Sequence, residues 1–90
     1  MNIQQLRYVV AIANSGTFRE AASKLFVSQP SLSVAIKDLE QELNFKIFTR
    51  TTTGAVLTSQ GMTFYERALE VVRSFDSFEN RYLNETEDRK

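Results

Sequence analysis

The chain has 90 residues, 11 basic and 11 acidic side chains, and neither Cys nor His. This length corresponds to one small domain, and a hydrophobic content of 42% excludes a disordered chain. The absence of Cys and His excludes disulfide bonds, thiolate or imidazole metal ligands, and His-based catalysis.

The charges are divided unevenly along the chain. Residues 1–58 hold six basic and four acidic side chains, whereas residues 59–90 hold five basic and seven acidic ones. This mild asymmetry means that an anionic partner must also be bound by backbone amides, hydroxyls and helix N-termini. The sequence has no run of about 18 apolar residues and its start lacks a signal-peptide pattern, so we expect a cytoplasmic protein without a membrane span.

Residues 3–13 are predicted to form the first helix. Ile3, Leu6, Val10 and Ala13 recur at the helical period, and their apolar neighbours broaden the buried face. Gly16 follows, and its freedom to adopt a left-handed conformation predicts the end of the helix.

Residues 17–43 read as a short helix, a tight turn and a longer helix. Thr17 has the spacing of a helix cap, and Ser28 is a plausible cap for the second helix, with Pro30 in its first turn. In that second helix the apolar stripe lies at spacings of four, three and four, and consists of Leu32, Ile36, Leu39 and Leu43. The stripe is expected to face the core.

The opposite side of the second helix carries Gln29, Ser33, Val34 and Lys37 near its start. These side chains are small, polar or basic, and no carboxylate precedes Asp38. A helix with a buried stripe and such an N-terminal face suits insertion into a DNA major groove.

Residues 44–58 are predicted to form a short hairpin. Asn44 tolerates positive φ after the helix, residues 45–50 read as a strand with Ile47 or Phe48 pointing inward, and residues 51–54 form a turn. Val56 and Leu57 return as a second strand. This hairpin is expected to be the wing of a winged helix-turn-helix.

A last, long helix is predicted from Ser59 to near Asn84, capped by Thr58. It carries an apolar heptad seam at spacings of four, three, four, three and four, formed by Phe64, Ala68, Val71, Phe75, Phe78 and Tyr82. A helix of this length exceeds what the small body can cover, so we interpret the seam as the interface of a homodimer. Residues 84–90 are charged and are expected to fray.

These features occur together in one known family. The stretches FREAASKLFVSQPSLSVAIKDLEQEL, FKIFTR and LTSQG fall in order, and the chain from about Ile3 to Gly61 resembles the DNA-binding domain of LysR-type transcriptional regulators. The resemblance implies a mainly α-helical winged helix-turn-helix over residues 1–58 and a linker and dimerisation helix over residues 59–90. It also implies a bacterial protein that binds double-stranded DNA and pairs its linker helices in antiparallel fashion.

The resemblance and the residues together predict the DNA-contacting side chains. They are Thr17, Ser28, Gln29, Pro30, Ser31, Ser33, Val34, Lys37, Arg50, Thr52 and Thr53. The family often carries Arg at the position of Val34 and another near Thr52. Their absence removes a guanine or phosphate contact and predicts weaker wing readout, limited to phosphate or sugar. Arg50 matches the Arg of the family's F-x-R motif and is either a phosphate ligand or an ion-pair partner within the domain.

The resemblance further implies a full-length protein with a C-terminal effector domain that binds a small-molecule co-inducer and permits a tetramer. That domain is absent from these 90 residues, which are expected to be a fragment. No cofactor, metal or enzymatic activity is predicted. The alternative left open is a winged-helix protein-interaction module that does not read DNA sequence, which zero net charge and Val34 slightly favour.

Overall fold

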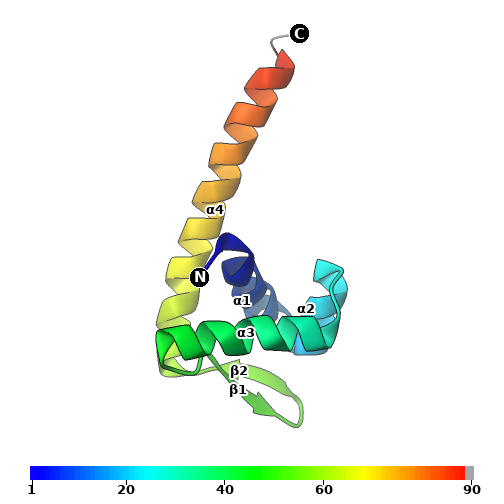
Figure 1. Cartoon of the computed structure of the whole chain (residues 1–90), viewed down its shortest axis with the longest axis vertical. Helices are drawn as coiled ribbons and strands as arrows, with labels where there is room; N and C mark the ends of the chain where they lie inside the picture. Colours follow the sequence, from blue (N-terminus) through cyan, green and yellow to red (C-terminus); the bar gives the residue numbers. More distant parts are fainter. Residues whose placement is uncertain (89–90) are drawn as a thin grey trace.

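The computed structural model describes residues 1–88, with side chains described up to Leu83. Its elements in chain order are α1 (Ile3–Ser15), α2 (Phe18–Leu25), α3 (Gln29–Leu43), β1 (Phe48–Thr51), β2 (Gly54–Leu57) and α4 (Ser59–Asp88). Figure 1 shows α4 projecting away from the body that the other elements form, which stretches the molecule to 52 × 24 × 19 Å. The predicted order of elements, a winged helix-turn-helix followed by one long helix, is confirmed.

Each of the first three helices begins at a side-chain cap. Thr17 accepts a hydrogen bond from the Glu20 N–H, and Ser28 accepts one from the Ser31 N–H, as the sequence predicted. At the start of α1, Asn2 and Gln5 form a complete capping box, which was not predicted from the sequence. These bonds satisfy N–H groups that have no partner inside the helix.

The same three helices each end at a residue in the left-handed conformation. Gly16 (φ 85°) ends α1 and Asn44 (φ 65°) ends α3, both as predicted. Phe26 (φ 59°) ends α2, which the sequence did not indicate because a bulky residue rarely adopts this conformation. Its N–H bonds the Ser23 carbonyl, and the next N–H, that of Val27, bonds the Ala22 carbonyl, so the turn into α3 is held by the end of α2.

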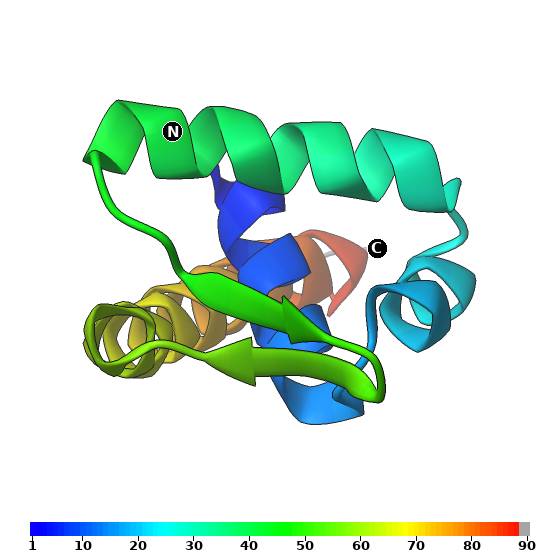
Figure 2. The ribbon, with the colours of Figure 1, turned by 90° about the horizontal axis from the view of Figure 1, so that it is seen from below.

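The main core lies between the first three helices and the hairpin. Figure 2 views the hairpin face of this body, with α3 along one side and α1 passing behind the strands. The buried residues come from α1, α2, α3 and the hairpin, and are Val9, Ile12, Phe18, Ala21, Ala22, Leu32, Ile36, Leu39, Ile47 and Phe48. The predicted stripe of α3 is therefore in the core, apart from the half-buried Leu43.

The wing is a two-stranded antiparallel hairpin in which Phe48 pairs with Leu57 and Thr51 with Gly54. The strand predicted from Phe45 begins three residues later, because the Glu40 carboxylate of α3 takes up the N–H groups of Ile47 and Phe48. Both Ile47 and Phe48 are buried, where the sequence had suggested one or the other.

A close backbone approach ties the hairpin to the turn between α1 and α2. The Ala55 N–H donates to the Gly16 carbonyl over 2.8 Å. Gly54 has φ 158°, and a Cβ at this position would collide with the same carbonyl oxygen. Glycine is therefore required at position 54 for the wing to lie beside the start of α2.

The first half of α4 packs on the body and the second half leaves it. Leu6 of α1 and Ala68 and Val72 of α4 form a second buried cluster. The bidentate pair of Arg7 with Asp76 is formed one turn further along α4. α4 continues to Asp88, past the predicted end near Asn84, and the last two residues of the tail that was expected to fray lie outside the described residues. No helix within residues 1–88 is both long and apolar enough to cross a bilayer.

Candidate nucleic-acid interface

The start of α3 is held by its own serines. The Ser28 hydroxyl accepts from the Ser31 N–H over 3.1 Å and donates to the Ser31 hydroxyl over 2.8 Å. Pro30 lies in the first turn, where its missing N–H costs no helical bond. Because the two hydroxyls are engaged with each other, Ser28 and Ser31 act first as supports for the helix N-terminus, whose partial positive charge faces solvent.

The predicted DNA-contacting side chains of α3 lie together on its solvent side. Gln29, Pro30, Val34 and Lys37 are exposed, and Ser33 is half-buried. The buried stripe occupies the other side of the same helix, so the helix is divided into a core face and a free face. The free face has no carboxylate over its first two turns, which leaves it compatible with a polyanion.

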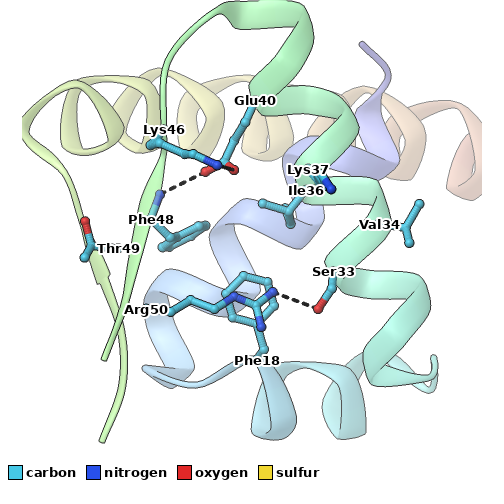
Figure 3. Close-up of a pocket in the computed structure, with 10 residues that line it drawn as sticks. All are labelled: Phe18, Ser33, Val34, Ile36, Lys37, Glu40, Lys46, Phe48, Thr49 and Arg50. Atoms are coloured by element: carbon cyan, nitrogen blue, oxygen red, sulfur yellow. Dashed lines mark hydrogen bonds and ion pairs between the residues drawn. The ribbon is translucent and has the colours of Figure 1, made fainter. Parts of the chain in front are cut away.

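A groove of about 480 Å³ runs between this face of α3 and the first strand of the wing (Figure 3). Its lining combines the buried wall of the core with polar and basic side chains at the rim, and consists of Phe18, Ser33, Val34, Ile36, Lys37, Glu40, Lys46, Phe48, Thr49 and Arg50. The predicted residues Ser33, Val34, Lys37 and Arg50 are thereby brought to one site.

Within residues 1–88 the contacts of Arg50 include no ion pair with a carboxylate, and its role as a phosphate ligand stays a prediction. Its guanidinium donates to the Ser33 hydroxyl over 2.8 Å. The guanidinium carbon also lies 3.7 Å from the centre of the Phe18 ring, within the range of a cation–π contact (Figure 3). Phe18 in turn meets Phe48 edge to face with ring centres 5.8 Å apart, so Arg50 rests on the core.

Glu40 closes the other end of the groove. Its carboxylate accepts from the N–H groups of Ile47 (2.7 Å) and Phe48 (3.2 Å) and lies 3.7 Å from the Lys46 ammonium. The side chain is only 11% exposed, so this carboxylate is directed into the protein and its charge is largely compensated. Glu40 therefore fixes the wing against α3 without presenting a free negative charge to the groove.

A second hollow, of about 240 Å³, brings the tip of the wing to the start of α2 and α3. It is lined by residues from all three segments: Thr17, Phe18, Arg19, Gln29, Arg50, Thr51, Thr52, Thr53 and Gly54. The Thr17 hydroxyl accepts the capping hydrogen bond of α2, whereas Thr52 and Thr53 are exposed at the turn. Five predicted residues (Thr17, Gln29, Arg50, Thr52 and Thr53) thus meet here, and Ser28, Pro30 and Ser31 line neither hollow.

The predicted seam of α4 is divided by the fold. Ala68 is 3% exposed in the cluster with α1, and Phe64 is half-buried with its ring 6.3 Å from that of Phe45. Beyond them Val71, Phe75, Phe78 and Tyr82 remain exposed along the projecting part of the helix. The first two seam positions therefore pack within the chain. The last four are exposed, although the Phe75 ring also meets the Arg7 guanidinium, 5.6 Å from its centre.

The structure places at this surface three charged side chains that the sequence did not predict there. Arg19 lines the hollow at the wing tip, and Lys46 and Glu40 line the groove. A signal existed for Arg19, because a basic residue in the first turn of a capped helix points away from the core stripe. The bond from Glu40 to the segment before β1 could not be read from the sequence, since it depends on the chain reversing at Asn44.

Comparison with known proteins places this geometry in a family. The family model described as "Bacterial regulatory helix-turn-helix protein, lysR family" matches residues 3–62. Among curated proteins, the HTH-type transcriptional regulator BudR of Klebsiella aerogenes is 43% identical over 77 residues, covering 86% of this chain and 54% of that protein. The chain spans 20–54% of the length of the first three curated relatives that it matches.

Solved structures agree in fold. The CbnR DBD–DNA complex is 30% identical with a TM-score of 0.86, and the match covers 96% of this chain and 99% of that one. The complex of BenM DBD with catB site 1 DNA is 31% identical with a TM-score of 0.89, covering 96% and 97%. Since the family model matches two thirds of the 90 residues, the chain belongs to the lysR family of bacterial regulatory helix-turn-helix proteins.

Proposed function

We propose that this chain is the sequence-specific DNA-binding part of a bacterial transcriptional regulator, and that it acts by placing the N-terminal half of α3 in a DNA major groove. The observation that carries the proposal is the free face of α3 beside the wing, with Gln29, Ser33 and Lys37 on one side and no carboxylate among them. Two proteins of the same fold have been crystallised with DNA, which supports DNA binding by this fold.

The side chains at the start of α3 match the chemistry of base edges. Gln29 can bond an adenine edge with both its amide groups, and the Ser33 hydroxyl can bond a base edge in the groove. Pro30 and Val34 are exposed and apolar, which suits contact with a thymine methyl group. We therefore assign base readout to these four residues.

Contacts to phosphate and sugar come from the edges of the same surface. The N-terminus of α3, Lys37 and the exposed hydroxyl of Thr52 provide donors without sequence preference. Thr53 lies beside them, and its hydroxyl, 3.3 Å from that of Thr51, can accept or exchange this bond for one to the DNA. Thr17 and Arg19 lie across the hollow from the wing tip and extend this set. Because only a few of the donors are charged, alignment on the backbone depends on hydroxyls and amides as much as on Lys and Arg.

We further propose a homodimer formed by the projecting half of α4. Val71, Phe75, Phe78 and Tyr82 form an exposed row that covers several turns, and pairing two copies removes it from water. Antiparallel pairing gives a two-fold dimer whose two α3 helices meet successive turns of a dyad-symmetric site. In a longer form of the protein, dimers could associate as tetramers and a small-molecule co-inducer could bind outside these residues. A chromosomal target implies a cytoplasmic location.

The test is selection of binding sites from a random-sequence double-stranded DNA library, followed by mobility shifts on the enriched site and on random DNA. Gln29→Ala is expected to weaken binding to the enriched site by about 1–3 kcal/mol while leaving binding to random DNA unchanged. Gln41→Ala is the matched control, because Gln41 is an exposed glutamine at the other end of the same helix. No enriched sequence, or equal losses on both DNAs, contradicts the proposal.

A further inference from the structure

The hydroxyl of Ser33 is held by a partner that can only donate. Arg50 donates to the Ser33 oxygen over 2.8 Å, and a guanidinium has no acceptor to offer in return. Within the described residues, Ser33 makes no other side-chain hydrogen bond. The hydroxyl proton is therefore not used inside the chain, whereas one of the two oxygen lone pairs is already occupied.

The position of Arg50 makes this arrangement persistent. Its backbone is paired with Ala55 across the wing, and its guanidinium lies on the face of Phe18, which is 6% exposed. Phe18 is itself held edge to face by Phe48. An arginine supported at its backbone and at its head group has fewer alternative rotamers than a solvated one, so the bond to Ser33 is maintained from the protein side.

We propose that Arg50 is a positioning residue that biases Ser33 toward donating its hydroxyl proton in the major groove, so that the half-site disfavours cytosine at the base which Ser33 faces. This inference rests on the proposed function and deepens it. A serine hydroxyl ordinarily bonds donors and acceptors alike, because it rotates to suit its partner. With the cationic Arg50 on one lone pair, the remaining lone pair of Ser33 is a weaker acceptor, and its unused proton is the group that the hydroxyl offers most strongly to the DNA.

The base preference follows from the edges exposed in the groove. Guanine offers the acceptors N7 and O6, adenine offers N7 and thymine offers O4, whereas cytosine presents only the donor of its N4 amino group. A serine biased toward donation therefore favours the three bases that offer an acceptor and disfavours cytosine, which offers only a donor. The adjacent guanidinium charge acts in the same direction, because it favours electronegative acceptor atoms over an amino group.

The experiment is the selection from a random-sequence double-stranded DNA library, carried out with the wild-type chain and three variants. In the wild type, cytosine is expected to be depleted about tenfold at one position of each half-site. Ser33→Ala removes this depletion because no hydroxyl remains. Arg50→Met keeps an unbranched stem on Phe18 but removes the donor, so the depletion should fall to about twofold or less while the rest of the enriched site is retained.

Lys37→Met is the matched control, since it removes a positive charge from the same groove without touching Ser33. It should weaken binding overall and keep the full depletion of cytosine. Depletion is a ratio among DNA sites bound by folded protein, so a loss of stability in Arg50→Met lowers the amount bound and leaves the ratio unaffected.

The outcomes separate this inference from the function on which it rests. A wild-type chain that enriches no sequence overturns the proposed function, and this inference with it. If the wild-type chain enriches a site in which no position is depleted of cytosine, the inference fails and the proposed function stands. The inference also fails, and the proposed function stands, if Ser33→Ala or Arg50→Met retains the depletion in full, or if Lys37→Met abolishes it.

Discussion

α3 and the projecting half of α4 carry nearly the same apolar pattern, but the apolar residues are buried in α3 and exposed in α4. In α3 the residues Leu32, Ile36 and Leu39 are spaced by four and three, and all are buried. In α4 the residues Val71, Phe75 and Phe78 have the same spacings, and Phe78 is 62% exposed. The spacing of apolar residues predicts that one face of a helix is buried, but it does not indicate whether that face packs within the same chain or against a second one.

The difference arises from where each helix lies. α3 crosses the body and is enclosed by α1, α2 and the wing, whereas α4 touches α1 only along its first half (Figure 1). Among the side chains described up to Leu83, Val72 is the last buried one of α4, and the Arg7–Asp76 pair follows one turn later. Beyond this point the apolar row continues over solvent, which is why we assign it to a second copy of the chain.

The largest expected effect is on the stability of the body. Leu39→Ala removes a fully buried side chain and should lower the free energy of unfolding by about 2–5 kcal/mol. In dilute protein, Phe78→Ala should change it by no more than about 0.5 kcal/mol. Chemical denaturation at several protein concentrations measures both. Equal losses in the two variants at low concentration would mean that the α4 row packs on its own chain.

Most of the fold follows from the sequence because its signals are local. Caps, helix-ending residues and apolar periods depend on neighbours in the chain, and they located the boundaries of α1, α2 and α3 within two residues. The predicted start of β1 was wrong by three residues, because the Glu40 carboxylate of α3 takes the place of a strand partner for the Ile47 N–H. The resemblance to LysR-type regulators is confirmed by the family match.

The sequence predicted which residues form much of the candidate site, but it predicted fewer of the contacts between them. The side chains on the free face of α3 could be identified by helical spacing, and the structure brings Ser33, Lys37 and Arg50 to one groove. The contact of Arg50 with Ser33 and Phe18 could not be foreseen, because it requires the register of the wing against α3. Ala68 is a second example: it fits the heptad pattern of the predicted dimer seam, although it is buried against α1 of the same chain.

Ala68 tests where the covered half of α4 ends. Ala68→Leu adds volume to a site that is 3% exposed, and overpacking of this kind should cost about 1–3 kcal/mol in the free energy of unfolding. Val71→Leu is the matched control, because Val71 is 49% exposed and its side chain can extend into solvent. Thermal or denaturant unfolding measures both. If Val71→Leu proved the more damaging variant, the boundary that we place after Val72 would be wrong.

Phe78 tests whether a second copy covers the projecting half. Phe78→Asp places a carboxylate in the exposed row and should weaken dimerisation at least tenfold, or about 1.4 kcal/mol, while the body stays folded. Ser77→Asp adds the same charge at the neighbouring exposed position and should leave the dimer intact. Sedimentation equilibrium at micromolar concentrations measures both. A wild-type monomer, or a Phe78→Asp variant that dimerises like the wild type, would place the interface elsewhere.

The smallest expected effect lies at the junction of the two halves. Asp76 accepts two hydrogen bonds from Arg7, at 2.6 and 3.3 Å, and this bonding, with the nearby positive charge, holds the pKa of the Asp76 carboxyl below its ordinary value of 3.8. A pKa that is lower in the folded chain means that ionised Asp76 favours folding. The contribution is therefore present above the ordinary pKa and is lost as the pH falls through the lowered one. Because the pair is solvated, the effect on stability should be slight, and the pKa itself is the better measurement.

Carbon-detected NMR titration of the Asp76 carboxyl should show the low pKa in the wild type and a higher one in Arg7→Gln. Arg67→Gln removes an ion pair with Glu70 on the same helix and should leave the pKa of Asp76 unchanged. Identical Asp76 titrations in the wild type and Arg7→Gln would mean that Arg7 does not hold α4 where the covered half gives way to the exposed one.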